Sequence, residues 1–173
     1  MLLIDVGNSA AKCRLLENHK TIDHRFPLGA DPVAGFQSLS EYLDDLTVTK
    51  VYLASVASDA VTQSLINIVQ QSLPEALFNR LYSLPLLGEI KNGYRNHRQL
   101  GVDRWLTLLA ASDRMPRDVV IIDAGSAITI DLLSRAKGHL GGAILAGLQT
   151  DSARFREIFA ALDFNHPDIQ KID

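Results

Sequence analysis

Leu3-Ile4-Asp5-Val6-Gly7-Asn8-Ser9 stands near the start of the chain, and a similar stretch, Ile121-Ile122-Asp123-Ala124-Gly125-Ser126-Ala127, stands in its second half. Each is an apolar run that ends in Asp-x-Gly, and strand-like sequence follows each, over residues 10–16 and 128–133. The pattern predicts a strand, a tight turn and a second strand, with a carboxylate where the first strand ends. The glycine lets a ligand approach the turn closely, and successive backbone N–H groups there can form an anion nest. A carboxylate beside such a nest suits a metal–phosphate ligand, and two copies indicate two halves that close on one nucleotide.

A lone Asp-x-Gly after a strand is most often a plain hairpin turn. Two copies, with Asn-Ser after one glycine and Ser-Ala after the other, favour the functional interpretation.

Composition excludes several classes of protein. The chain has 173 residues, of which 47% are hydrophobic and 21% charged, which suits one globular core or two small lobes. A net charge of −3 and a pI near 5.9 argue against a nucleic-acid partner or a polybasic membrane surface. The apolar runs are shorter than the ~20 residues that a bilayer crossing needs. The single cysteine, Cys13, lies in an apolar strand pattern and is expected to be buried. One cysteine excludes a disulfide within the chain, which fits a cytoplasmic protein, and we expect no signal peptide.

Hydrophobic periodicity predicts an α/β fold of two lobes that begin alike. In the first lobe, residues 1–95, we expect strands at 2–6, 10–16, 21–26, 50–56 and 78–84, and helices at 33–46 and 58–73. In the second lobe, residues 96–173, we expect helices at 101–114 and 150–162, strands at 118–123, 127–133 and 138–145, and a loop-like tail at 163–173. Both lobes contain three strands followed by a helix. The second then lacks the β-α-β remainder, so it is expected to be incomplete.

The first turn offers the groups that a nucleotide with a divalent cation needs. Asp5 can hold the cation directly or through water, since Mg²⁺ takes only one or two carboxylates. Gly7, Asn8 and Ser9 provide donors to phosphate, and Lys12 can add a point charge. The sequence contains no Walker A loop.

The stretch Leu100-Gly101-Val102-Asp103-Arg104-Trp105 is expected to open a helix. An aspartate in the first turn is favoured by the helix dipole, so Asp103 has a plain structural interpretation. The dipole does not favour Arg104 there, which predicts that its side chain reaches an anionic substrate. An aspartate that accepts a hydroxyl proton is also the base of kinases. Tyr94, in a polar loop just before, is either a substrate contact or a surface aromatic.

These motifs, together with His139-Leu-Gly-Gly-Ala-Ile-Leu-Ala-Gly147, resemble those of type III pantothenate kinase, also described as the Bvg accessory factor family. The resemblance implies the actin/Hsp70/sugar-kinase superfold, with duplicated ribonuclease-H-like lobes. It implies ATP-dependent phosphorylation of pantothenate to 4'-phosphopantothenate, the first step of coenzyme A biosynthesis. It also implies a homodimer, Mg²⁺ with ATP, and K⁺ or NH₄⁺ as a monovalent cation.

The resemblance also assigns roles to residues. Asp103 would be the general base, Arg104 would bind the pantothenate carboxylate, Asp123 would hold the monovalent cation, and Asp5 would hold the divalent cation with ATP. The expected ATP-binding residues are Asp5, Val6, Gly7, Asn8, Ser9, Ala10, Ala11, Lys12 and Ser126. The expected pantothenate-binding residues are Tyr94, Gly101, Val102, Asp103 and Arg104.

The chain departs from the family pattern at three points. Family members usually have proline in place of Ala146 and more often threonine in place of Ser126, and both changes are mild. Family chains also run well beyond residue 173, so we expect a fragment or a shortened protein. Two alternatives therefore stay open: a non-catalytic accessory or regulatory protein on the same scaffold, and a kinase of another small hydroxylated substrate. The intact carboxylates Asp5, Asp103 and Asp123 favour catalysis.

Overall fold

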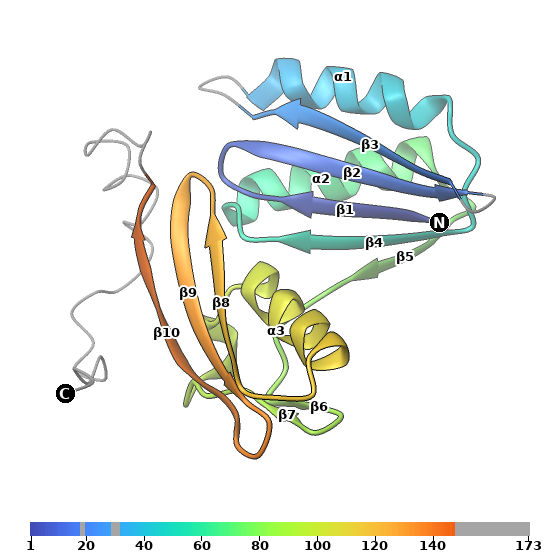
Figure 1. Ribbon diagram of the computed structural model, residues 1–173. Coiled ribbons are helices and arrows are strands. Elements are labelled where there is room, and N and C mark those ends of the chain that lie inside the picture. Colours follow the sequence, from blue (N-terminus) through green and yellow to red (C-terminus); the bar gives the residue numbers. More distant parts are fainter. Residues whose placement is uncertain (18–19, 29–31, 148–173) are drawn as a thin grey trace.

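The computed structural model describes residues 1–17, 20–28 and 32–147, and it shows a mixed α/β protein built on two sheets (Figure 1). The first sheet has the order β3-β2-β1-β4-β5. Its strands are β1 (Leu2–Val6), β2 (Ala10–Glu17), β3 (Lys20–Pro27), β4 (Lys50–Ser55) and β5 (Leu77–Arg80), and its helices are α1 (Pro32–Asp44) and α2 (Asp59–Ser72). The second sheet has the order β10-β9-β8. Its strands are β8 (Val119–Ala124), β9 (Ala127–Ser134) and β10 (Gly138–Ala146), preceded by α3 (Val102–Arg114).

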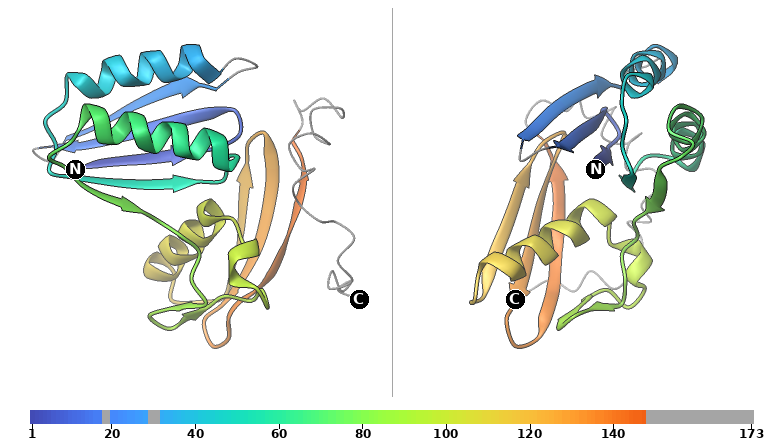
Figure 2. Two further views of the ribbon diagram at one scale, coloured as in Figure 1. Left: turned by 180° about the vertical axis from the view of Figure 1, so that it is seen from behind. Right: turned by 90° about the vertical axis from the view of Figure 1, so that its right-hand side faces the viewer.

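The alternation of side chains along the strands explains why both helices pack on one face of the first sheet. On β1, Leu2, Ile4 and Val6 are buried, while Asp5 points to the opposite face. Both α1 and α2 cover the buried face, where Leu39 and Leu65 join the same core (Figure 2). β1 runs antiparallel to β2 and parallel to β4, as crossover connections through helices require. Ser58 caps the N-terminus of helix α2, because its Oγ accepts a hydrogen bond from the Val61 N–H.

The segment between the two sheets differs from the expected strand at 78–84. Pairing with β4 ends at Arg80, because the chain then turns toward the second core, where the buried Ser83 Oγ donates to the Leu100 carbonyl at 2.6 Å. A two-stranded ribbon, β6 (Leu86–Leu87) and β7 (Ile90–Lys91), and a 3-10 turn at His97–Gln99 follow. These elements are too short for hydrophobic periodicity to reveal them.

The second sheet repeats the antiparallel start of the first. β8, β9 and β10 correspond to β1, β2 and β3, and Asp123 pairs with Thr129 as Asp5 pairs with Lys12. Helix α3 packs Trp105 and Leu108 into a second core with Leu133. It contacts β4 of the first sheet as well as β8 and β9 of the second, and lies between the sheets (Figure 1).

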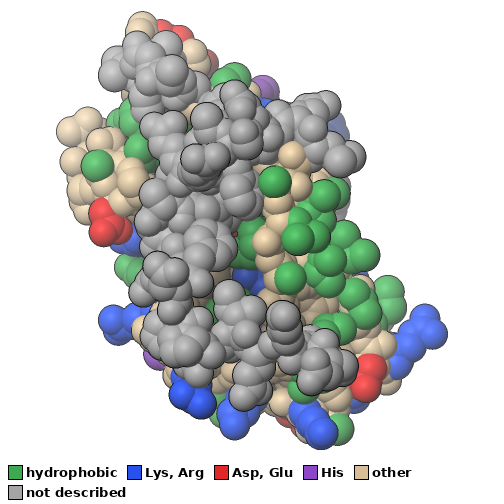
Figure 3. All heavy atoms as spheres, turned by 90° about the vertical axis from the view of Figure 1, so that its left-hand side faces the viewer, with side chains coloured by type: hydrophobic (Ala, Val, Ile, Leu, Met, Phe, Trp, Pro, Cys, Tyr) green, Lys and Arg blue, Asp and Glu red, His purple; other side chains and the backbone are tan. Residues whose placement is uncertain are grey.

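The other face of the second sheet is apolar along all three strands. Its cross-strand triplets are Val120–Leu132–Gly141, Ile122–Ile130–Ala143 and Ala124–Ile128–Leu145. They correspond to the triplets Leu2–Leu15–Ile22, Ile4–Cys13–His24 and Val6–Ala11–Phe26, on the face that α1 and α2 cover in the first sheet. Within the described ranges Ile122 stays 64% exposed, and hydrophobic side chains gather on this side of the molecule (Figure 3). The helix predicted at 150–162 and the tail at 163–173 lie outside the described residues.

None of the described helices combines the length and the apolar character that a membrane crossing needs.

Cys13 is predicted to be chemically inert in the folded protein. Its side chain is buried on β2, and burial raises the pKa of the thiol to about 12. Since the thiolate is the reactive form, a thiol reagent such as DTNB at pH 8 should leave the native protein unlabelled and label one thiol per chain in denaturant. Rapid labelling of the native protein would contradict this placement.

Candidate active site

The two Asp-x-Gly turns, which are far apart in sequence, lie side by side in the structure. Each turn is closed by its glycine, with Gly7 N–H donating to Ala10 at 3.0 Å and Gly125 N–H donating to Ala127 at 2.9 Å. The hydroxyls of Ser9 and Ser126 are 3.0 Å apart. The backbone N–H groups and hydroxyls predicted to contact phosphate therefore converge from both sheets on one place.

Three carboxylates approach this place from three elements. Asp5 lies near the end of β1, where its carboxylate is 3.6 Å from Lys12 Nζ and 47% of the side chain is exposed. Asp123 lies near the end of β8, and Asp103 lies in the first turn of α3. Burial raises the pKa of Asp103, and the negative charges of Asp5 and Asp123 raise it further, against the lowering effect of the hydrogen bond from Arg104 N–H. The structure thus raises the pKa of Asp103 above the ordinary value of an aspartate.

Gly101 makes room for the Asp103 carboxylate. It is the cap residue of α3, and the Trp105 N–H donates to its carbonyl at 2.9 Å. A Cβ at Gly101 would collide with Asp103 Oδ1, which accepts a hydrogen bond from Arg104 N–H at 2.7 Å. The Gly-Val-Asp-Arg motif therefore places a carboxylate at the helix start, where backbone N–H groups have no partner within the helix.

Arg104 is held by a carboxylate that the sequence analysis did not single out. Its Nε and Nη2 donate to the two oxygens of Asp131 at 2.8 and 2.7 Å, and its Nη1 donates to the Tyr94 hydroxyl at 3.4 Å. His139 Nε2 lies 2.8 Å from Asp131 Oδ1, and the His139 ring stacks on Tyr94 at 5.8 Å. Burial alone would raise the pKa of Asp131, but the hydrogen bonds from His139 and Arg104 outweigh it, so the carboxyl stays ionised. The one sequence signal for Asp131 is a charged residue inside an otherwise apolar strand.

Asn92, also unremarked in the sequence, positions the loop that carries Tyr94. Its buried side chain accepts a hydrogen bond from the Tyr94 N–H at 3.0 Å and donates to the Leu84 carbonyl at 3.2 Å. Asn92 also donates to the His97 carbonyl at 3.4 Å. Tyr94 is therefore a fixed part of the site and faces the Arg104 guanidinium, which lies 5.9 Å from the ring centre.

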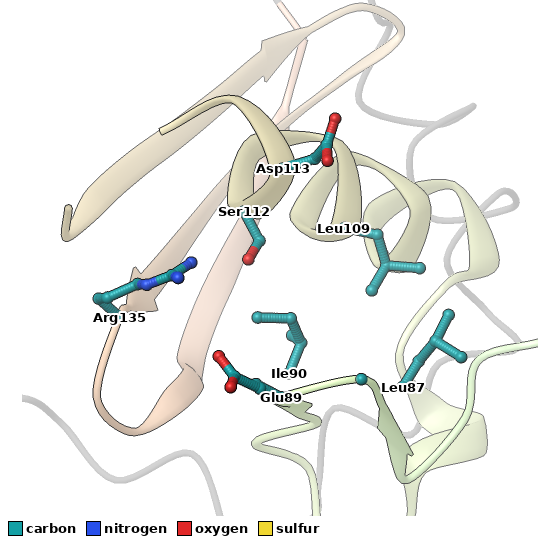
Figure 4. A pocket seen from close by; sticks show the side chains of 8 residues that line it. Leu87, Glu89, Ile90, Leu109, Ser112, Asp113 and Arg135 are labelled. Atoms are coloured by element: carbon teal, nitrogen blue, oxygen red, sulfur yellow. The ribbon is translucent and has the colours of Figure 1, made fainter. Parts of the chain in front are cut away.

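Two cavities adjoin these elements. One, of about 630 Å³, lies on the face of the first sheet that α1 and α2 leave open; Asp5, Lys12 and Arg14 line it, together with Leu106 of α3. The other, of about 420 Å³, lies near the opposite end of α3, between Asp113, Glu89 and Arg135 (Figure 4). Of these two cavities, the first contains the predicted site residues Asp5 and Lys12, so it adjoins the candidate site.

The residues present fit a magnesium ion that arrives with phosphate. Among residues 1–17, 20–28 and 32–147, no cluster of three His, Cys, Asp or Glu side chains could hold a metal alone. Mg²⁺ typically takes one or two carboxylates and completes its shell with water and substrate phosphates, and Asp5 supplies such a hard oxygen donor. Asp123, on the matching strand of the second sheet, is a separate oxygen donor beside this place.

Two sheets that start with the same hairpin and bring their Asp-x-Gly turns together define a duplicated α/β protein. A family model described as type III pantothenate kinase matches residues 1–171. A type III pantothenate kinase of Chromobacterium violaceum is 34% identical over 84% of this chain and 58% of its own length. One of Pseudomonas aeruginosa is 32% identical over 90% of this chain and 62% of its own length. The chain belongs to the type III pantothenate kinase family.

The chain spans about 58–62% of the length of these curated relatives. Among solved structures, an Aquifex aeolicus member of the Ppx/GppA protein family aligns with 91% of this chain and 53% of its own, at 14% identity and a TM-score of 0.47.

Proposed function

We propose that this protein transfers the γ-phosphoryl group of ATP to the hydroxyl of pantothenate. The observation that carries the proposal is the convergence of the two Asp-x-Gly turns, through Ser9 and Ser126, beside the half-buried carboxylate of Asp103 in the first turn of α3. Family membership supports the choice of substrates.

In this proposal, Asp103 is the general base. The pantothenate hydroxyl gives its proton to the Asp103 carboxylate while its oxygen attacks the γ-phosphorus. The bond between the γ-phosphorus and the bridging oxygen breaks, and its electron pair leaves with ADP. A raised pKa makes a carboxylate a better proton acceptor at neutral pH. The turn residues Asp5 to Lys12, with Ser126, bind the ATP phosphates. Tyr94 and Gly101 to Arg104 bind pantothenate, and Arg104 faces its carboxylate.

We further propose that Asp5 helps hold Mg²⁺ with ATP, and that Asp123 holds K⁺ or NH₄⁺. The cations would neutralise phosphate charge as the γ-phosphoryl group moves. We place the reaction in the cytoplasm and propose that the active species is a homodimer.

Incubation of the full chain with ATP, pantothenate, Mg²⁺ and K⁺ tests the proposal. Mass spectrometry should detect 4'-phosphopantothenate and ADP in equal amounts. A panel of other small alcohols and sugars serves as the control for substrate choice. Absence of product with every acceptor would support the accessory-protein alternative, and turnover of a different acceptor alone would overturn the choice of pantothenate.

The raised pKa of Asp103 predicts a particular pH profile. Since the base must be ionised, kcat/KM should fall as pH drops through its pKa, above the ordinary aspartate value of about 3.9. A pH titration of kcat/KM measures this limb, and an acid limb at or below the ordinary aspartate value would contradict the assignment.

A further inference from the structure

The residues around Arg104 accept hydrogen bonds from some of the N–H groups of its guanidinium and leave the others available. A guanidinium has five N–H donors in a fixed fork. Asp131 takes the edge formed by Nε and Nη2, and the Tyr94 hydroxyl takes one N–H of Nη1. Two N–H groups, one on Nη1 and one on Nη2, make no hydrogen bond within the part of the chain that the structure describes; we call the Nη1–Nη2 side of the fork its outer edge.

Asp131 itself is held in place by His139. A carboxylate can only accept, so the His139 Nε2 at 2.8 Å from Asp131 Oδ1 carries the proton of this hydrogen bond. Both side chains are almost fully buried, at 0% and 1% exposure, and the His139 ring is stacked on Tyr94. Arg104, Asp131, His139 and Tyr94 therefore form one network in which the guanidinium cannot rotate without breaking two charged hydrogen bonds.

Gly142 lets β10 pack directly against the guanidinium and its carboxylate partner. It pairs with Asp131 across β9 and β10, and a Cβ built on it would lie 2.6 Å from Arg104 Nη2. The same Cβ would also collide with Asp131 Oδ1 and with the Ile130 carbonyl, so any other residue at this position would disturb the pair. The backbone of β10 is thus shaped around the Arg104–Asp131 pair.

We infer that Asp131, oriented by His139, is a positioning residue that turns the outer Nη1–Nη2 edge of Arg104 toward the carboxylate of the acceptor substrate. The inference rests on the proposed function, in which Arg104 recognises pantothenate. It adds that substrate preference for a carboxylate depends on a residue that never touches the substrate. The alternative, a purely structural ion pair, predicts equal effects on all acceptors.

Pantothenol separates the two cases, since it replaces the carboxylate of pantothenate with a neutral alcohol group. We would measure the affinity of each compound by calorimetry and the KM and kcat of each by initial rates. For Asp131→Asn and for His139→Phe we expect about ten- to hundredfold weaker binding of pantothenate, through KM rather than kcat, and little change for pantothenol. His139→Phe keeps the ring stacked on Tyr94 and removes only the donor to Asp131.

The conservative change and a matched control sharpen the result. His139→Gln retains a donor and should recover most of the preference for pantothenate. Asp118→Asn alters another carboxylate bonded to β9, through Ser134 and Arg135, and should leave both affinities unchanged. Equal losses for pantothenate and pantothenol in His139→Phe would overturn the inference, and this variant decides the matter if Asp131→Asn does not fold. A wild-type chain that binds neither compound would instead refute the proposed function, and the inference with it.

Discussion

Asp103→Asn is expected to reduce phosphoryl transfer by about a hundredfold to ten-thousandfold while the protein stays folded. Asparagine has the same shape as aspartate, and its carbonyl oxygen can still accept the hydrogen bond from Arg104 N–H. It cannot accept a proton, so only the general base is lost. The change also removes a half-buried charge that desolvation disfavours, which gives no reason for a loss of stability.

Steady-state rates with ATP and pantothenate, together with thermal melts, measure this effect. The matched control is Asp113→Asn in the same helix. Asp113 lines the cavity near the other end of α3, so this substitution should leave the rate unchanged. A rate near that of the wild type in Asp103→Asn would remove Asp103 from the chemistry. A lowered rate with a lowered melting temperature would indicate a structural role instead.

The parts of this molecule that local patterns encode were predictable. Alternation along β1 and β8, glycine in both turns and helical spacing on α2 determine their own conformations, and the expected mixed α/β fold is confirmed. The family is confirmed as well. The end of β5 and the β6–β7 ribbon could not be predicted, because contacts with the second core determine them.

The polar network of the site could not be predicted from local sequence patterns either. The sequence indicated that Arg104 does not serve the helix dipole, but it could not show that Asp131 is its partner. That pairing joins α3 to β9 across 27 positions and depends on how the second sheet packs on the helix. The sequence motif contains His139, but only the pairing of β9 with β10 shows that its side chain contacts Asp131. Asp5, Asp103 and Asp123 were predicted as site residues, and their individual roles stay predictions.

Arg104→Met is expected to destabilise the protein by about 3–5 kcal/mol, because it leaves Asp131 as a buried carboxylate without its cation. The side chains of Arg104 and Asp131 are 6% and 1% exposed, so water cannot replace the lost partner. Methionine fills a similar volume, which keeps the loss of packing small. Urea unfolding at neutral pH measures the change, and a variant as stable as the wild type would show that the pair contributes nothing to the fold.

A second change and a change of pH test whether uncompensated charge causes this loss. Adding Asp131→Asn to Arg104→Met removes the buried charge, while the new amide oxygen still accepts from His139, so part of the stability should return. In the wild type the pKa of Asp131 is lowered, so the pair stabilises the fold above the unfolded value near 3.9 and loses its effect as pH falls through the folded value. In Arg104→Met burial dominates and raises that pKa, so acid relieves the penalty. The stability gap between wild type and Arg104→Met should therefore narrow as pH is lowered, whereas a loss caused by packing alone would be independent of pH.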